Sequence, residues 1–228
     1  MVGAFGGFGA RTLNTVIGDY RQGVQESATI NDMKIDLVSA RLAGFRWRAQ
    51  GDPALREEFR GYIDRLGEDI SSLGLTEMRG QLDQYAGFFD TAVGHQADRN
   101  RRVAVMVEEG PQIRRNLTEI VESAYADDDS EASYFASNAQ EHLMLGRLYG
   151  ERFLVTNAAT DAERAQAELA EASLALQTLL PLLENPARED LTQDAMRRLD
   201  LFTAGFEGAV EAITSRNAAL AQMDRIGP

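Results

Sequence analysis

Apolar residues recur along this chain at spacings of three and four positions. Ile30, Met33, Leu37, Ala40 and Gly44 form one such series, and this spacing places side chains on one face of an α-helix. The alternating β-branched runs that indicate strands do not occur in the sequence. The pattern therefore predicts an all-α fold.

Capping and helix-breaking residues divide the pattern into six predicted helices, because Gly, Asn and Pro end helices and Asp begins them. These residues are Gly51-Asp52-Pro53, Gly74, the acidic turn at 127–130, Asn157 and Asn185-Pro186. The predicted helices cover about residues 12–49, 53–72, 76–125, 131–157, 161–184 and 188–225, two of them long and four short. Pro111 lies inside the third helix, so a bend or a short break is expected at Gly110-Pro111.

Comparison of the sequence with itself indicates an internal duplication. Residues 82–111 align without a gap with 199–228, are identical at eleven positions, and both end in Gly-Pro. The motif Arg-Leu-x-Gly-x-Arg-aromatic at 41–47 recurs at 147–153. Duplication with two long helices predicts two four-helix bundles stacked end to end, each using half of each long helix. The predicted modules are residues 11–98 with 212–228, and residues 99–211.

The charge balance limits the class of partner. A net charge of −13, from 36 acidic and 23 basic residues, argues against nucleic acid and anionic membrane surfaces. Lys34 is the only lysine, so the other basic residues are arginines, whose planar guanidinium groups hold carboxylates in a two-pronged fashion. The chain lacks cysteine, and His95 and His142 are not at metal-binding spacings. No metal, no cofactor and no enzymatic activity are expected.

The helix lengths bring arginines from two helices beside aromatic residues in each module, near the junction of the modules. The candidates are Arg41, Trp47, Tyr85 and Arg216 in one module, and Arg147, Arg152, Phe202 and either Arg99 or Arg102 in the other. Guanidinium groups between apolar walls suit a small carboxylate. The alternative for each arginine is a solvated or ion-paired surface position, and for each aromatic residue a place in the core. Gly44 and Gly150 fit either close helix contact or room for a ligand.

Taken together, these features resemble the helical bimodular sensor domain of bacterial chemotaxis receptors. The resemblance covers essentially the whole chain and rests on the duplicated modules, the two long and four short helices, the Arg-Leu-x-Gly-x-Arg-aromatic stretch before Gly51-Asp52, and the terminal Gly-Pro. It implies a periplasmic, ligand-binding region between two transmembrane helices of an inner-membrane receptor, which is a homodimer at full length. The implied ligand is a small organic acid, bound in one or both modules and sensed through the last helix.

The same resemblance implies which arginines bind. They are Arg41, Arg46 and Arg216 in the membrane-proximal module, and Arg147, Arg152 and Arg99 in the membrane-distal module. Arg48 departs from the pattern and makes the proximal cluster denser.

Other interpretations remain open at this stage. The sensor domain of a histidine kinase that docks a periplasmic binding protein would have the same architecture, as would a structural helical spacer. The sequence has no run of the roughly 18 to 20 apolar residues that a membrane span needs. Its apolar, glycine-rich start at 1–10 lacks basic residues, so it does not read as a signal peptide; it fits either the end of a preceding membrane helix or a frayed terminus.

Overall fold

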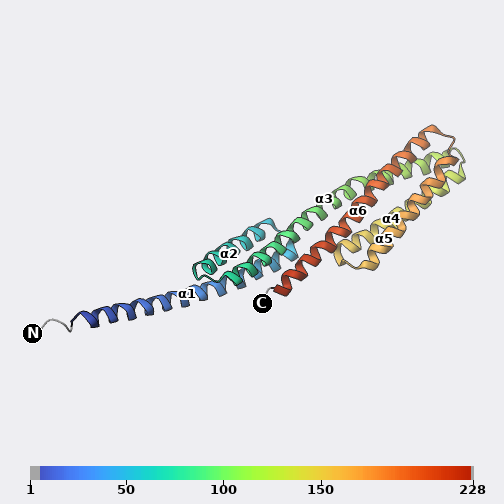
Figure 1. Ribbon diagram of the computed structural model, residues 1–228. Coiled ribbons are helices and arrows are strands. Elements are labelled where there is room, and N and C mark those ends of the chain that lie inside the picture. The colour runs from blue at the N-terminus through green and yellow to red at the C-terminus, as the bar shows by residue number, and fades with distance from the viewer. Residues whose placement is uncertain (1–5, 227–228) are drawn as a thin grey trace, which may run out of the picture. The chain divides into compact units, whose positions relative to one another are not determined.

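A computed structural model describes the backbone of residues 6–226 and the side chains of residues 27–226. The first half of the apolar start and the second Gly-Pro of the repeat, Gly227-Pro228, lie outside the described residues. The elements in chain order are α1 (Gly6–Gln50), α2 (Pro53–Ser72), α3 (Thr76–Ala126), α4 (Ser130–Thr156), α5 (Ala159–Leu179), the 3-10 helix η1 (Leu180–Leu182) and α6 (Pro186–Ile226) (Figure 1). The prediction of an all-α fold with six α-helices is confirmed.

Local chemistry sets the helix boundaries at the predicted breaks. Asp52 precedes α2 and accepts a hydrogen bond from the backbone N–H of Ala54 at 2.9 Å, which satisfies one of the unpaired N–H groups of the first turn. Gly51 provides the left-handed backbone, with φ of +67°, that the α1–α2 turn requires. Asn157 ends α4 in the same conformation, with φ of 57°, as asparagine tolerates better than most residues.

Two helices that contain or approach a proline differ from the sequence-based prediction. The predicted short break at Pro111 does not occur, because α3 continues through it. The carbonyl that loses its N–H partner belongs to Val107, whose side chain is 69% exposed, so this part of the helix borders water. The fifth helix ends earlier than predicted, at Leu179, and tightens into η1 around Pro181.

The chain divides into two compact units. Unit 1 comprises residues 1–91 and 219–228, and unit 2 comprises residues 92–218. Helices α3 and α6 therefore each contribute to both units. The units divide these helices after Thr91 and Ala218, whereas the predicted modules divide them after residues 98 and 211.

Aromatic rings form the centre of the core of unit 1. The Phe59 and Phe89 rings stack with centroids 3.8 Å apart, and Trp47 meets Phe89 edge-on at 5.0 Å. The α2 residues that face this core are spaced by three or four: Leu55, Phe59, Ile63, Leu66 and Ile70. Burial of such side chains stabilises the fold by about 1.5 to 3 kcal/mol each.

Small residues form much of the core of unit 2, where α4 and α5 pair along their length (Figure 1). Nine buried alanines belong to its main hydrophobic cluster: Ala124, Ala132, Ala136, Ala139, Ala162, Ala165, Ala172, Ala175 and Ala195. A Cβ on Gly146 would lie 2.9 Å from the Leu169 side chain, so glycine permits the close contact of α4 with α5.

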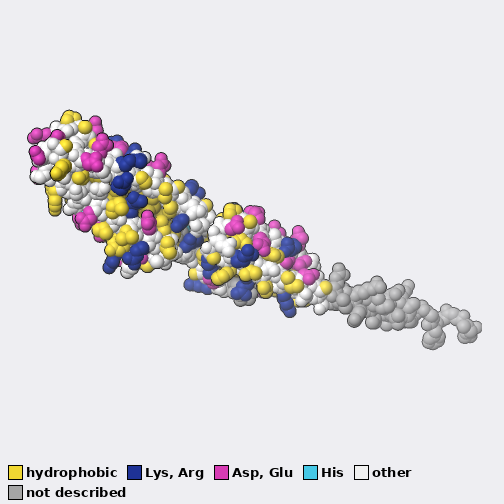
Figure 2. Space-filling model, turned by 180° about the vertical axis from the view of Figure 1, so that it is seen from behind, with side chains coloured by type: hydrophobic (Ala, Val, Ile, Leu, Met, Phe, Trp, Pro, Cys, Tyr) yellow, Lys and Arg dark blue, Asp and Glu magenta, His cyan; other side chains and the backbone are white. Residues whose placement is uncertain are grey.

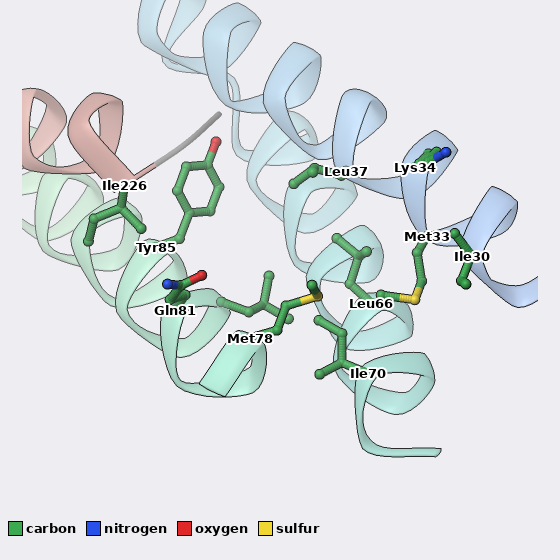
Figure 3. A pocket seen from close by; sticks show the side chains of 11 residues that line it. Ile30, Met33, Lys34, Leu37, Leu66, Ile70, Met78, Gln81, Tyr85 and Ile226 are labelled. Atoms are coloured by element: carbon green, nitrogen blue, oxygen red, sulfur yellow. The ribbon is translucent and has the colours of Figure 1, made fainter. Parts of the chain in front are cut away.

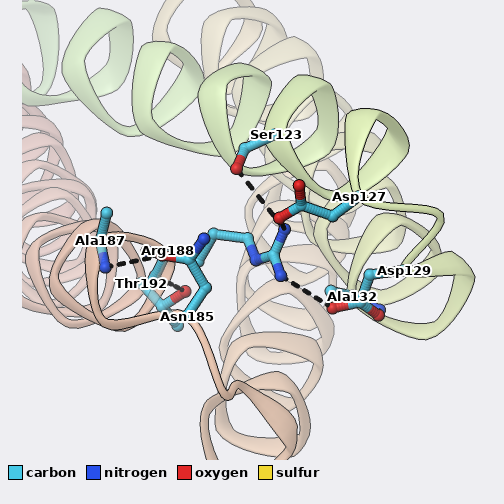
Figure 4. A network of polar contacts seen from close by, with 8 residues as sticks. All are labelled: Ser123, Asp127, Asp129, Ala132, Asn185, Ala187, Arg188 and Thr192. Atoms are coloured by element: carbon cyan, nitrogen blue, oxygen red, sulfur yellow. Dashed lines mark hydrogen bonds and ion pairs between the residues drawn. The ribbon is translucent and has the colours of Figure 1, made fainter.

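A buried arginine connects the two ends of the α3–α4 turn to α6 (Figure 4). Arg188 is 4% exposed; its guanidinium donates to Asp127 at 2.9 Å and to Asp129 at 3.2 Å. The acidic turn that the sequence presented as a helix cap is therefore also half of an ion-pair network. Asp129 performs both tasks, because it also accepts from the Ala132 N–H at 3.0 Å.

The described surface is mixed in charge. On the face drawn in Figure 2, acidic and basic side chains are interspersed with apolar ones. Among the described residues, none of the helices has the combination of length and apolar character needed to cross a membrane.

Candidate functional site

A cavity of about 380 Å³ in unit 1 contains two arginines, and we call it the arginine cavity. Its lining residues come from α1, α3 and α6: Val38, Arg41, Leu42, Gly44, Phe45, Arg48, Tyr85, Met223 and Asp224. Arg41 and Arg48 lie seven positions apart on α1, so two turns of helix bring them to the same face. Most of the remaining lining side chains are apolar.

The two arginines of this cavity differ in their bonding. Arg48 donates two hydrogen bonds from Nη2 to the carboxylate of Asp224, at 3.0 and 3.1 Å. Arg41 makes no hydrogen bond or ion pair with any residue that the structure describes. Two guanidinium groups thus face one carboxylate, and the cavity keeps one positive charge available for an anion.

Tyr85 supplies an uncharged hydrogen-bond donor to the same cavity from a largely buried side chain. Its side chain is 7% exposed, and its hydroxyl has no hydrogen-bond partner among the described residues. Burial raises the pKa of Tyr85 above its usual value of 10.0, although the positive charge of Arg41 lowers it. The hydroxyl therefore stays protonated at neutral pH and can donate a hydrogen bond to a carboxylate.

A second cavity of about 380 Å³, which we call the apolar cavity, lies in the same unit (Figure 3). It is lined by Ile30, Met33, Lys34, Leu37, Leu66, Ile70, Met78, Gln81, Leu82, Tyr85 and Ile226. Tyr85 lines both cavities. In Figure 3 its ring borders the space while its hydroxyl points toward α1, and the amino group of Lys34 points away from the space.

Of the five predicted proximal residues, the structure brings Arg41 and Tyr85 together in one cavity. Trp47 is 4% exposed and packs in the core against Phe89, so it is not a wall of the arginine cavity. Arg46 is exposed and lies 4.0 Å from the carboxylate of Glu58 on α2, so it joins the α1–α2 hairpin instead.

Arg216, the fifth predicted proximal residue, belongs to unit 2. Its guanidinium donates to Gln96 at 2.6 Å and to Asn157 at 3.0 Å. Asn157 is the left-handed residue that ends α4. Arg216 therefore ties the α4–α5 turn to α6, a role that depth along the helix could not predict because it depends on which neighbours offer an oxygen.

In unit 2, two of the four predicted distal residues lie near Gly110. A Cβ on Gly110 would lie 3.3 Å from the Phe202 ring and 3.4 Å from Nε of Arg147. Arg147 is half-buried, and, like Arg41, has no hydrogen bond or ion pair within the described part of the chain. These residues form a candidate distal site, in which the phenyl ring of Phe202 offers no hydroxyl.

The other two distal candidates have local partners. Arg152 forms an ion pair with Asp161 at 3.2 Å, and the carboxyl side chain of Asp161 is only 7% exposed. Arg99 donates to the amide oxygen of its neighbour Asn100 at 3.1 Å. Arg152 thus joins α4 to α5, as Arg46 joins α1 to α2.

Sequence reasoning missed Asp224 and the apolar cavity. Asp224 aligns with Val107 in the repeat, so the duplication gave no sign of a carboxylate at this position. The sequence shows that Arg48 lies close to Arg41 and Arg46, but it does not show that Arg48 forms an ion pair with Asp224 of α6. The apolar cavity is lined mostly by residues of the kind that form a core, and a spacing pattern does not show whether the space between such residues is filled.

Among the described residues, no group of three or more His, Asp or Glu side chains could hold a metal ion. His142 accounts for one imidazole: its Nδ1 lies 2.7 Å from the Glu168 carboxylate, between α4 and α5. Comparison of the sequence with models of known protein families gave no match, and comparison with curated proteins gave none either.

Proposed function

We propose that this chain is the ligand-binding sensor domain of a transmembrane chemotaxis receptor, of the helical bimodular kind, and that it binds a small organic acid in the arginine cavity. The observation that carries the proposal is the position of Arg41. Its guanidinium shares a cavity with the hydroxyl of Tyr85 and has no partner in the described part of the chain. The domain is non-enzymatic and extracytoplasmic in this proposal.

The chemistry of the cavity fits the carboxylate of a small organic acid. A guanidinium donates two parallel N–H bonds that match the two oxygens of a carboxylate. The Tyr85 hydroxyl adds a third donor. Apolar side chains in the same lining would contact the hydrocarbon part of an organic acid.

Three pairs of similar contacts, two of them at corresponding positions of the repeat, support the duplicated modules that the proposal includes. Each unit has an arginine that joins its hairpin, in the pairs Arg46–Glu58 and Arg152–Asp161. Each has an edge-on ring contact, Trp47–Phe89 at 5.0 Å and Phe153–Phe206 at 5.9 Å. Each places the first arginine of the repeated motif near an aromatic residue of a long helix, Arg41 near Tyr85 and Arg147 near Phe202. In the ring pairs and the arginine–aromatic pairs the positions correspond in the sequence repeat, whereas Glu58 and Asp161 do not.

The site in unit 1 is the better carboxylate site of the two. Tyr85 in unit 1 corresponds to Phe202 in unit 2 in the sequence repeat. The hydroxyl donor is therefore present only in the unit 1 copy of this pair. We assign the principal ligand to the arginine cavity, and a weaker or different one to the surroundings of Arg147.

A ligand in the arginine cavity would contact the last helix. Met223 and Asp224 of α6 line the cavity opposite Arg41 and Arg48 of α1. An anion that pairs with Arg41 changes the charge that Asp224 faces, and so shifts the balance of contacts between α1 and α6. We propose that this shift is the signal.

A row of exposed apolar side chains on α1 supports the homodimer that the proposal implies. Ile35, Val38, Leu42 and Phe45 are 57%, 64%, 56% and 67% exposed. Their spacing of three, four and three is that of a coiled-coil seam. A second copy packed along this row would remove it from water and would lie beside the arginine cavity, because Val38, Leu42 and Phe45 also line that cavity.

A thermal-shift screen of the 228-residue chain against small mono- and dicarboxylates, amines and amino acids tests the proposal. A ligand at about 100 times its dissociation constant stabilises the folded state by about 2.7 kcal/mol. Stabilisation by carboxylates that is lost in Arg41→Ala would support direct sensing. Stabilisation by no small molecule would instead favour a docking domain for a binding protein or a structural spacer.

A further inference from the structure

We infer that the ligand of unit 1 is a monocarboxylate with an apolar tail, whose carboxylate pairs with Arg41 and whose tail occupies the apolar cavity. The inference rests on the proposed function of the arginine cavity and specifies its ligand class. It follows from the charge of one cavity, the lining of the other, and the residue that they share.

The charge of the arginine cavity favours a single carboxylate. Arg48 is already held by Asp224 through two hydrogen bonds, so Arg41 is the guanidinium that is left for a ligand. A second carboxylate on the ligand would lie in the same cavity as the Asp224 carboxylate and be repelled by it. A dicarboxylate therefore fits the charges less well than a monocarboxylate.

The two cavities adjoin each other. Tyr85 lines both. On α1, Leu37 lines the apolar cavity and Arg41 the arginine cavity, and residues four apart lie about 6 Å apart along one face of a helix. On α6, Ile226 lines the apolar cavity and Met223, three residues earlier, lines the arginine cavity. The spacing between head and tail sites is therefore about one helical turn.

The lining of the apolar cavity matches a hydrocarbon. Apart from Lys34, Gln81 and Tyr85, its lining side chains are aliphatic or thioether groups. Figure 3 shows the Lys34 amino group directed away from the space and the Tyr85 ring bordering it. A tail in this space would leave water for an apolar surround, while the hydroxyl of the same tyrosine remains available to the head group.

Calorimetric titration of the 228-residue chain with acetate, butyrate, hexanoate and octanoate tests the inference, with succinate and octan-1-ol as comparison ligands. We expect the dissociation constant to fall by about fourfold for each methylene that enters the apolar cavity. Succinate should bind more weakly than hexanoate, and octan-1-ol more weakly than octanoate. Equal affinities for butyrate and octanoate, or tighter binding of succinate than of hexanoate, would overturn the inference.

Two matched methionine variants locate the tail. Met78 lines the apolar cavity and is 45% exposed, whereas Met144 lies on α4 in unit 2 and is 47% exposed. Met78→Glu should weaken octanoate at least tenfold and leave butyrate within twofold, and Met144→Glu should change neither. Loss of octanoate affinity in both variants, or in neither, would contradict a tail in the apolar cavity.

Failure of the inference is distinguishable from failure of the proposed function. If carboxylates bind without regard to tail length and Arg41→Gln weakens all of them, the arginine cavity is a carboxylate site and the tail assignment is wrong. If none of these acids binds the chain, the proposed function itself is wrong.

Discussion

Asp224 on α6 holds the guanidinium of Arg48 on α1 through two hydrogen bonds, of 3.0 and 3.1 Å, in the wall of the cavity that also contains Arg41. This pair gives the cavity its only lining carboxylate among the described residues. It therefore decides how much negative charge a ligand can bring. It also joins the first and last helices at the point where a ligand would bind.

The first prediction removes that carboxylate. Asp224→Asn frees Arg48 and takes away the repulsion toward a second ligand carboxylate, so succinate should bind about two- to fivefold more tightly. Asp90→Asn is the matched control, because Asp90 is also an exposed partner of an arginine, Arg60 at 2.8 Å, but does not line the cavity. Calorimetry that finds succinate binding unchanged in Asp224→Asn, or improved equally in the control, would contradict this role of Asp224.

The second prediction concerns the Tyr85 hydroxyl. Tyr85→Phe removes a donor with no partner among the described residues, so the free energy of unfolding should change little. Carboxylate affinity should fall about tenfold, because a hydrogen bond to a charged group contributes about 1.5 kcal/mol or more. Chemical denaturation and calorimetry on the same variant separate the two effects. A large loss of stability with unchanged affinity would place the hydroxyl in a structural role.

The third prediction tests the network around Arg188 (Figure 4). Arg188→Leu leaves Asp127 and Asp129 without their shared partner and should lower the free energy of unfolding by about 1 to 3 kcal/mol. The cost stays moderate because Asp127 is 54% exposed and remains hydrated. Arg115→Leu, at an exposed position of α3, is the control and should change stability by less than about 0.5 kcal/mol. Equal effects of the two variants in urea denaturation would show that the network contributes nothing.

The fourth prediction is a pH dependence of stability. The Arg198 guanidinium, at 2.6 Å, and the Asn116 amide, at 2.8 Å, hold the pKa of Asp194 below its usual value of 3.8. The stabilisation is therefore present above about pH 4 and is lost as the pH falls through the depressed pKa. Asp194→Asn should lower the free energy of unfolding at pH 7 by on the order of 1 kcal/mol and make it less dependent on pH between about 4 and 2. If the free energy of unfolding of this variant depends on pH between about 4 and 2 as it does in the unmodified chain, Asp194 is not the source of that dependence.

The helices could be predicted from the sequence because their signals are local. The spacing of Leu55, Phe59 and Ile63, and the cap at Asp52, depend on neighbours within one or two turns. The short break suggested by Pro111 does not occur, because the tolerance of a proline depends on whether water reaches the carbonyl that it leaves free, which is not a local signal.

The candidate site could be predicted only in part. The repeated Arg-Leu-x-Gly motif pointed to Arg41 and Arg147, which have no ion-pair partners in the described part of the chain. The same motif also contained Arg46 and Arg152, and nothing in the spacing distinguishes them from the first pair. Their roles follow from the carboxylates of Glu58 and Asp161 across each hairpin, which are tertiary contacts. Tertiary neighbours likewise gave Arg216 a structural role.

Calorimetric titration of Arg41→Ala beside Arg46→Ala tests the central claim most directly, because both arginines are exposed and lie five positions apart on the same helix. With the best carboxylate from the thermal-shift screen as ligand, Arg41→Ala should weaken binding about tenfold to a hundredfold, which corresponds to the loss of about 1.5 to 3 kcal/mol. Arg46→Ala should leave the affinity within about twofold. Unchanged affinity in Arg41→Ala, or an equal loss in both variants, would contradict a carboxylate site at Arg41.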